Sequence, residues 1–305
     1  MSIRELVVLG TASQVPTRYR NHNGYLLRWD EEGLLFDPGE GTQRQMIHAD
    51  VSPTSVTRVL ITHFHGDHCL GLAALSQRFS LDAVPHPIHC YFPASGHVFY
   101  DRMRQASIYY VNATMVPHPI VAAGELETTR GFTLSCARLD HGAVETYGYR
   151  LQEPDGRTFL PERLQSAGIR GPAVGELART GAVVVDGRRI TAEEMSTPRP
   201  GQAMAFVMDT RPCDAALELA RDVDLLVIES TYLSSEAREA HDHGHMTAAQ
   251  AATIARDAGA KRVVLTHFSQ RYLSLDAFAE EAGAIHGDVR IARDGMRIPV
   301  PKRHR

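Results

Sequence analysis

The chain has 305 residues, which is enough to bury a substantial core in one large domain or two. Its formal net charge of −4 gives no overall positive field, so a nucleic-acid partner would have to be bound through local basic patches. No apolar stretch approaches the length of a membrane span, and four scattered cysteines without a secretory signal indicate buried thiols in a reducing compartment. These features are typical of a soluble cytoplasmic enzyme.

Short β-rich runs dominate the first half of the chain, and strands alternate with helices in the second half. In the first half we predict strands at 6–10, 24–29, 34–37, 59–62, 88–92, 132–139 and 147–151, with helices at 70–79 and 96–106. In the second half we predict strands at 205–208, 224–229 and 262–265, with helices at 213–220, 248–258 and 275–286. Helices between strands indicate covered sheets, so the predicted class is α/β.

The segment from about 152 to 202 interrupts this pattern. Glycine and proline break up every long element there, and large apolar residues are sparse, so we expect the segment to project from the body as an arm or lid. The seven arginines between 151 and 200 are matched by seven acidic residues, so counting does not show a basic arm. A disordered linker remains an alternative.

The densest chemistry lies directly after the apolar run 58–61. Within six residues stand three histidines and one aspartate: His63, His65, Asp67 and His68. A strand ending there would enter a tight loop, where Gly66 lets the backbone turn the last two of these side chains inward. Imidazole and carboxylate groups are ligands that zinc prefers, and four of them suggest two metals about 3.5–4 Å apart. The alternative is a histidine-rich surface loop.

Three further ligand candidates follow other β-like runs: His141, Asp209 and His267. The run 262–268 repeats the pattern of 58–64, since both are apolar strands that end in Thr-His-Phe. If the two halves of the fold arose by approximate duplication, both strand ends would deliver a histidine to the same cleft. With the first cluster this gives five histidines and two aspartates, which can form two metal sites if one aspartate bridges them.

Taken together, the motifs resemble ribonuclease Z, the tRNA 3′-processing endonuclease of the metallo-β-lactamase superfamily, over nearly the whole chain. The superfamily motif H-x-H-x-D-H is 63–68, and the family's other motifs follow the same order at 36–42, 141, 209–210, 244–247 and 267–272. The loop 16–21 resembles the family's P-x-K-x-R-N loop, with Arg18 in place of lysine, and Met246 stands where serine is often found. The resemblance implies a four-layer αββα sandwich in a single domain over 1–305, with a flexible tRNA-binding arm inserted at about 152–202.

The resemblance also implies the metal ligands. His63, His65 and His141 would hold one zinc, Asp67, His68 and His267 would hold the second, and Asp209 would bridge them. This gives two Zn²⁺ per subunit, although other divalent metals could fill the sites. Metal coordination lowers the pKa of water to about 7, which supplies a nucleophile near neutral pH.

Other residues take roles around this centre in the resemblance. Asp67 matches the general base and His245 the candidate general acid, which would protonate the ribose oxygen that leaves. Asp37 is expected to orient a ligand imidazole, and Glu229 to orient His245, although an ordinary cap is as good a reading of Glu229. The candidates for contacts with the tRNA are Arg18, Arg20, Asn21 and Arg271.

The expected activity is a zinc-dependent endoribonuclease that removes the 3′ trailer from precursor tRNA, leaving a 3′-hydroxyl on the tRNA and a 5′-phosphate on the trailer. A homodimer is expected from the resemblance alone. One alternative is a hydrolase of the same fold acting on small phosphodiesters, thioesters or lactones, which would need neither the arm nor the loop 18–21. Another is a non-catalytic RNA-binding protein that keeps the fold.

Overall fold

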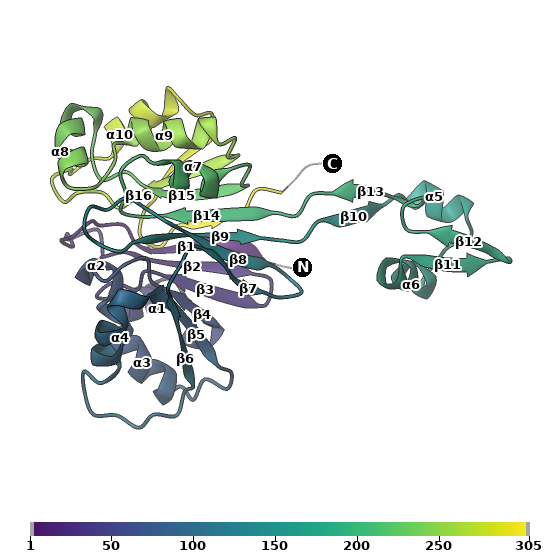
Figure 1. Cartoon of the computed structure of the whole chain (residues 1–305), viewed down its shortest axis with the longest axis horizontal. Coiled ribbons are helices and arrows are strands. Elements are labelled where there is room, and N and C mark those ends of the chain that lie inside the picture. Colours follow the sequence, from purple (N-terminus) through teal and green to yellow (C-terminus); the bar gives the residue numbers. More distant parts are fainter. Residues whose placement is uncertain (1–2, 303–305) are drawn as a thin grey trace.

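Two seven-stranded sheets pack against each other in the computed structural model, which describes residues 3–302 (Figure 1). The first sheet has the order β18-β1-β2-β3-β4-β5-β6, with β1 (Arg4–Gly10), β2 (Gly24–Trp29), β3 (Glu32–Phe36), β4 (Arg58–Leu60), β5 (Ile88–Pro93), β6 (Met115–Ile120) and β18 (Arg297–Pro299). The second has the order β17-β16-β15-β14-β9-β8-β7, with β7 (Gly124–Thr128), β8 (Thr133–Arg138), β9 (Tyr147–Gln152), β14 (Ala203–Val207), β15 (Leu225–Glu229), β16 (Arg262–Thr266) and β17 (Val289–Ile291).

The inner faces of the sheets share one core, and helices cover both outer faces. Phe36 of β3 stacks on Phe206 of β14 with 4.5 Å between ring centroids, which joins the two sheets directly. Apolar clusters on the outer faces involve α1 (Thr42–His48), α3 (Gly71–Leu81) and α4 (His97–Arg104) on one side, and α7 (Asp214–Ala220), α9 (Ala248–Asp257) and α10 (Asp276–Gly283) on the other. The central strands of each sheet read as nearly continuous apolar runs because both of their faces are buried. The α/β class is confirmed, and every predicted strand and helix is present, with ends shifted by a few residues.

The two sheets repeat one pairing pattern. From one edge to the other, each has three antiparallel pairs followed by three parallel pairs, so β3, β4 and β5 correspond to β14, β15 and β16. The two Thr-His-Phe runs end β4 and β16, which are not corresponding strands. Asp37 and Asp209, in contrast, follow the corresponding strands β3 and β14, and both have a positive φ, 43° and 41°. The repeated Thr-His-Phe is therefore not a relic of aligned duplication, although both histidines reach one cleft.

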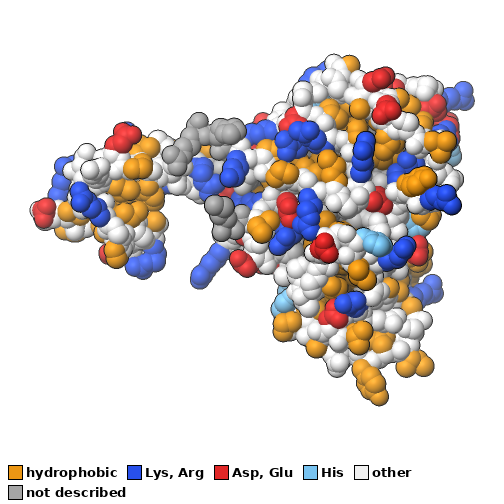
Figure 2. All heavy atoms as spheres, turned by 180° about the vertical axis from the view of Figure 1, so that it is seen from behind, with side chains coloured by type: hydrophobic (Ala, Val, Ile, Leu, Met, Phe, Trp, Pro, Cys, Tyr) orange, Lys and Arg blue, Asp and Glu red, His pale blue; other side chains and the backbone are white. Residues whose placement is uncertain are grey.

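The segment between β9 and β14 extends away from the sandwich (Figure 1). Its elements are β10 (Gly156–Phe159), α5 (Pro161–Ser166), α6 (Pro172–Thr180), β11 (Ala182–Val185), β12 (Arg188–Thr191) and β13 (Ser196–Arg199). Strands β10 and β13 pair as a ribbon, and at its end Leu164, Ile169, Leu177, Val183 and Ile190 form a small separate core. The segment is thus folded along its length. Figure 2 shows basic side chains on it and on the adjoining part of the sandwich.

Within residues 3–302, no helix combines the length and the apolar character that crossing a membrane requires.

Candidate metal centre

Strand ends from both sheets meet at a pocket of about 680 Å³. His65 and Asp67 come from the loop and the short α2 (Gly66–Cys69) that follow β4, His141 follows β8, and Asp209 follows β14. His267 directly follows β16. These side chains come from distant parts of the sequence but all follow ends of strands, where functional residues of such sheets collect.

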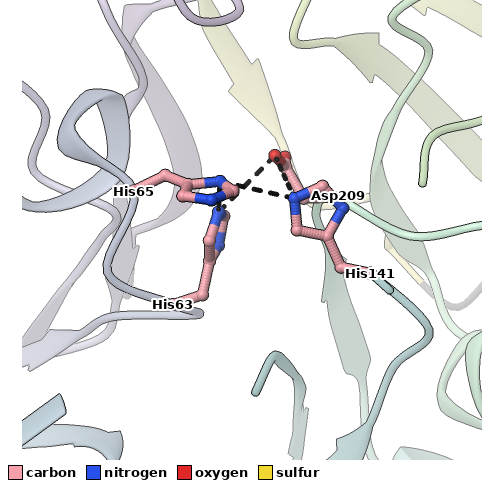
Figure 3. Close-up of side chains that lie close together, drawn as sticks. All are labelled: His63, His65, His141 and Asp209. Atoms are coloured by element: carbon pink, nitrogen blue, oxygen red, sulfur yellow. Dashed lines mark hydrogen bonds and ion pairs between the residues drawn. The ribbon is translucent and has the colours of Figure 1, made fainter. Parts of the chain in front are cut away.

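One half of the centre consists of His63, His65, His141 and Asp209, whose potential ligand atoms all lie within 4.8 Å of one another (Figure 3). Oδ2 of Asp209 lies 3.6 Å from Nε2 of His63 and 3.7 Å from Nε2 of His141. Nδ1 of His65 lies 2.9 Å from Nε2 of His63. These nitrogens and this oxygen converge on one point, as the ligands of a single cation do.

The other half consists of Asp67, His68 and His267, which form a second group within the same 4.8 Å limit. Oδ2 of Asp67 lies 3.4 Å from Nε2 of His68 and 3.5 Å from Nε2 of His267. Oδ1 of Asp209 lies 3.3 Å from the former nitrogen and 3.2 Å from the latter. Asp209 thus presents one oxygen to each half, which is the geometry expected of a bridging carboxylate.

Thr62 and Asp37 contact the Nδ1 atoms of His63 and His68, which are the ring nitrogens that face away from the centre. Asp37 is fully buried; it accepts the Thr62 hydroxyl at 2.8 Å and lies 2.8 Å from Nδ1 of His68. Because Thr62 donates to Asp37, its oxygen can only accept from Nδ1 of His63, 3.0 Å away. Both histidines are therefore protonated on Nδ1, which leaves the lone pair on Nε2, the nitrogen that would bind a metal. Asp37 therefore has the position that its predicted orienting role requires.

Glu229 organises the opposite side in the same manner. It is fully buried and accepts the Thr231 hydroxyl at 2.7 Å, which leaves Thr231 to accept from Nδ1 of His267 at 2.8 Å. Its other oxygen lies 2.9 Å from Nδ1 of His245. Glu229 thus contacts His245, the residue that it is predicted to orient, and through Thr231 it also contacts His267, a contact that the sequence does not predict. His141 completes the set, with Nδ1 at 2.9 Å from the carbonyl oxygen of Gly244.

The donor set fits divalent cations. Among residues 3–302, Oδ1 of Asp209 and Nε2 of His267 are buried without a hydrogen-bond partner, a costly state that a cation between them would relieve. Burial holds the pKa of His63 well below its usual value, so the ring is neutral, as a metal ligand must be. Asp37, Asp209 and Glu229 are three buried carboxyl groups at this centre. Nitrogen and carboxylate ligands in two adjacent groups make this a metal-binding centre typical of a dinuclear hydrolase.

Backbone conformation adds to the cost of this arrangement. His267 has φ 61°, and Asp209 and Asp37 also lie in the left-handed region that non-glycine residues rarely adopt. Such strain persists only where surrounding contacts enforce it, and it concentrates at functional sites. The backbone is therefore strained at each of these three residues, and the surrounding contacts hold it in that conformation.

The residues predicted to contact tRNA lie in different environments. Arg18 is exposed, whereas Arg20 donates to the carbonyl oxygens of Tyr272 and Ser269 at 2.9 and 3.1 Å. Asn21 uses its side-chain amide to donate to backbone carbonyl oxygens as well. Arg20 and Asn21 thus shape their loop in this structure.

Arg271 lies at the edge of the pocket, as a phosphate-binding arginine would. It forms a two-pronged ion pair with Glu239 of α8 (Ala237–Asp242), and its guanidinium lies 5.0 Å from the ring centroid of Tyr232. Neither Glu239 nor Tyr232 is predicted from the sequence, because nothing local marks either residue. The pairing occupies the guanidinium face that would bind a phosphate.

Comparison with known proteins agrees with this geometry. Residues 17–160 match the model of the metallo-beta-lactamase superfamily, and 185–268 match that of the beta-lactamase superfamily domain. A ribonuclease Z of Nocardia farcinica is 56% identical over 305 residues, which cover 99% of this chain and 100% of the relative. One of Salinispora arenicola is 57% identical, with 99% and 98% covered. The crystal structure of the short form of human tRNase Z has a TM-score of 0.72 at 26% identity, covering 98% of this chain and 100% of that one.

Proposed function

The chain belongs to the ribonuclease Z family of the metallo-β-lactamase superfamily, and on that premise we propose that it removes the 3′ trailer from precursor tRNA in the cytoplasm. The expected products are a tRNA with a 3′-hydroxyl and a trailer with a 5′-phosphate. The observation that carries the proposal is the position of Asp209, with one carboxylate oxygen toward each of two ligand groups. Paired metal sites of this kind are typical of enzymes that cleave phosphodiesters.

Two cations, expected to be zinc, would be held by the two halves of the centre. His63, His65, His141 and Oδ2 of Asp209 would hold one, and Asp67, His68, His267 and Oδ1 of Asp209 the other. When bound, such ions polarise phosphoryl oxygens and lower the pKa of water to about 7. The chain's part is to fix the ligands: Thr62, Asp37, Gly244 and Thr231 hold their outer nitrogens.

Proton movement falls to Asp67 and His245. Asp67 is placed to accept a proton from the attacking water, because its Oδ2 lies at the centre of the site, 3.4 Å from Nε2 of His68 and 3.5 Å from Nε2 of His267. His245 lies on the pocket wall, paired with Glu229. It supplies the proton that the ribose 3′-oxygen needs when the bond to phosphorus breaks.

Substrate selection is assigned to the arm at about 152–202, inserted in a single sandwich domain. The arm extends far from the sandwich in Figure 1, so it can contact the body of a tRNA whose 3′ end lies at the metal centre. Helical RNA is recognised mainly by shape and backbone contacts, which suits a small folded module with mixed charge. Arg18 and Arg271 are the loop residues best placed to bind phosphates near the cut, since Arg18 is exposed and Arg271 lines the pocket.

A homodimer is part of the proposal. The segment after α4 exposes Ile108, Tyr110 and Val111, whose exposed fractions are 103%, 91% and 62%. Large apolar side chains exposed together are typical of an interaction surface. Phe99 of α4 is also exposed and lies 5.8 Å, between ring centroids, from Phe64 of the histidine-rich loop. A second copy bound here would lie next to the active site. Light scattering of the wild type should give the mass of a dimer, and Tyr110→Ser should reduce the fraction of dimer. A wild-type protein with the mass of a monomer would contradict the proposal.

The experiment that tests the function is cleavage of a precursor tRNA with zinc, with both product ends mapped. We expect a single cut at the 3′ end of the tRNA and no cleavage by His68→Ala, which removes a buried ligand. Hydrolysis of bis(p-nitrophenyl) phosphate with intact precursor would instead indicate a small-molecule phosphodiesterase. RNA binding without turnover would indicate a non-catalytic RNA-binding protein.

A further inference from the structure

We propose that Asp294, which lies outside the pocket, is a positioning residue that holds the half of the metal centre formed by Asp67 and His267. It does so by clamping the loop 11–21 against both of them. The inference rests on the proposed dinuclear centre, because it concerns how one half of that centre is kept in place.

Asp294 lies in the turn between β17 and β18, and its carboxylate joins three separate parts of the chain. Oδ1 accepts the hydroxyl of Thr11 at 2.8 Å, and Oδ2 accepts the backbone N–H of Asn21 at 2.7 Å. Oδ2 also accepts the side-chain amide of Gln45, on α1, at 3.1 Å. A charged acceptor with several donors makes stronger hydrogen bonds than a neutral one, so this carboxylate is a firm anchor.

The two ends of the loop that Asp294 holds are packed against each other. The backbone N–H groups of Thr11 and Ala12 both donate to the carbonyl oxygen of Asn21, at 3.0 and 2.9 Å. At Gly10 a Cβ atom would lie 1.7 Å from the carbonyl oxygen of His22, so only glycine allows this approach. Asp294 accepts a hydrogen bond from Thr11 at one end of the loop and from Asn21 at the other, and it therefore holds the two ends together.

The locked loop contacts the metal centre at two points. The backbone N–H of Gln14 donates to Oδ2 of Asp67 at 2.7 Å, which is the oxygen that faces His68 and His267. Gln14 has φ 56°, so its N–H points at Asp67 only while the loop enforces a strained conformation. Losing the clamp would let Gln14 relax and free Asp67 to rotate.

The second point is the backbone beside His267. Phe268 donates its N–H to the carbonyl oxygen of Thr11 at 2.9 Å, and Ser13 donates to the carbonyl oxygen of Phe268 at 3.0 Å. Arg20, from the same loop, also holds the carbonyl oxygens of Ser269 and Tyr272. His267 needs this support because its own φ is 61°.

The other half of the centre does not depend on this loop. Within residues 3–302, no hydrogen bond joins the loop 11–21 to His63, His65 or His141. Loss of the clamp should therefore affect the two halves unequally. That inequality distinguishes a positioning role from general structural support.

The test is metal affinity of the full-length protein, measured by zinc content during titration with a competing chelator. Asp294→Asn keeps the shape but presents an amide N–H₂ to donors, and we expect the second zinc to bind about tenfold or more weakly, as is typical when a residue that orients a ligand is lost. The first zinc should bind as in the wild type. The visible spectrum of the cobalt-loaded protein should likewise lose the contribution of one site. Asp257→Asn, at an exposed aspartate on α9, is the matched control and should match the wild type.

A second variant covers the case in which Asp294→Asn does not fold. Thr11→Val keeps the volume of a fully buried side chain but removes one donor to Asp294, and it should produce a milder loss of the same zinc. Two zinc ions bound as in the wild type, or an equal loss of both, would overturn the proposal. A wild-type protein that binds fewer than two zinc ions would instead refute the dinuclear centre on which the proposed function depends.

Discussion

Oε1 of Glu229 lies 2.9 Å from Nδ1 of His245, and Glu229 has no exposed surface. Burial alone would lower the pKa of His245, but the charges of Glu229 and Asp209 outweigh it and raise the pKa to about 9. His245 therefore carries a proton at neutral pH, as a general acid must before it protonates a leaving oxygen. Through Thr231, the same carboxylate also orients His267. One buried residue thus contacts both the proposed general acid and a proposed metal ligand.

This relationship predicts a dependence on the leaving group. His245→Ala should slow cleavage of precursor tRNA about 10²- to 10⁴-fold, the usual contribution of a positioned acid, because a ribose oxygen leaves poorly without a proton. Hydrolysis of bis(p-nitrophenyl) phosphate should change little, since a nitrophenolate leaves without one. Glu229→Gln should slow both substrates, and precursor tRNA more strongly, because Glu229 also contacts His267 through Thr231. Rates of both substrates under single-turnover conditions measure the effect.

The control for this prediction is Asp37→Asn, which affects metal ligands and not the acid. It should slow both substrates alike. Equal losses on both substrates in His245→Ala would contradict the acid role and favour His245 as a metal ligand, which its position near Asp209 and His267 also allows.

The motif residues could be predicted from the sequence because their spacing is local. His63 to His68 stand in one loop after an apolar strand, and the strand ends before Asp209 and His267 are equally plain. The α/β class and the central strands of both sheets follow from apolar runs, whereas β6, β7, β17 and β18 at the sheet edges are not predicted. The supporting residues could not be predicted, since their partners are distant in the sequence: Gln14 reaches Asp67 across 53 positions.

Some elements also escape sequence reasoning for physical reasons. β6 contains Pro117 and Pro119, which edge strands tolerate but which weaken any strand prediction. Helix α1 buries only Thr42 and Met46, so its apolar pattern is too short to detect. The arm is similar: its few large apolar residues form a core only because helices and a hairpin bring them together.

Arg271 should bind a substrate phosphate in competition with Glu239. Arg271→Ala should raise the KM for precursor tRNA, whereas Glu239→Gln should lower it about two- to fivefold, because an exposed ion pair contributes at most about 1 kcal/mol. Steady-state kinetics at two salt concentrations measure both. Glu218→Gln, which breaks a similar exposed pair between Glu218 of α7 and Arg221, is the control and should leave KM unchanged. A higher KM in Glu239→Gln would show that the pair instead holds Arg271 in its binding position.

The core of the arm should matter for tRNA and not for chemistry. Leu177 is fully buried there, and Leu177→Ala should cost the arm about 2–5 kcal/mol of stability, as for other buried leucines. We expect the KM for precursor tRNA to rise about tenfold, which corresponds to a loss of about 1.4 kcal/mol of binding. Val184→Ala, at a side chain 70% exposed on β11, is the control. Slower hydrolysis of a small diester in Leu177→Ala would assign the arm a structural role in the active site.

Titration of Asp294 should make the free energy of unfolding depend on pH. Burial raises the pKa of this carboxyl to about 6, although hydrogen bonds from Asn21 and Thr11 oppose the shift. In the unfolded chain the pKa is about 3.9, so between these values the folded protein binds more protons than the unfolded one. Its stability must therefore fall as the pH rises from about 4 to about 6, by up to about 3 kcal/mol, because each pKa unit corresponds to about 1.4 kcal/mol.

Asp294→Asn removes this titration, so the variant should become steadily more stable relative to the wild type over that pH interval. Urea unfolding of both proteins at several pH values, without added metal, measures the difference, and other titrating groups cancel because they are shared. Asp257→Asn should run parallel to the wild type throughout, since its side chain is exposed. Parallel curves for Asp294→Asn would mean that its carboxyl is solvated well enough to titrate normally. The predicted slope would instead show that the protein tolerates a desolvated charge at Asp294, which fits its use as an anchor for the loop beside Asp67.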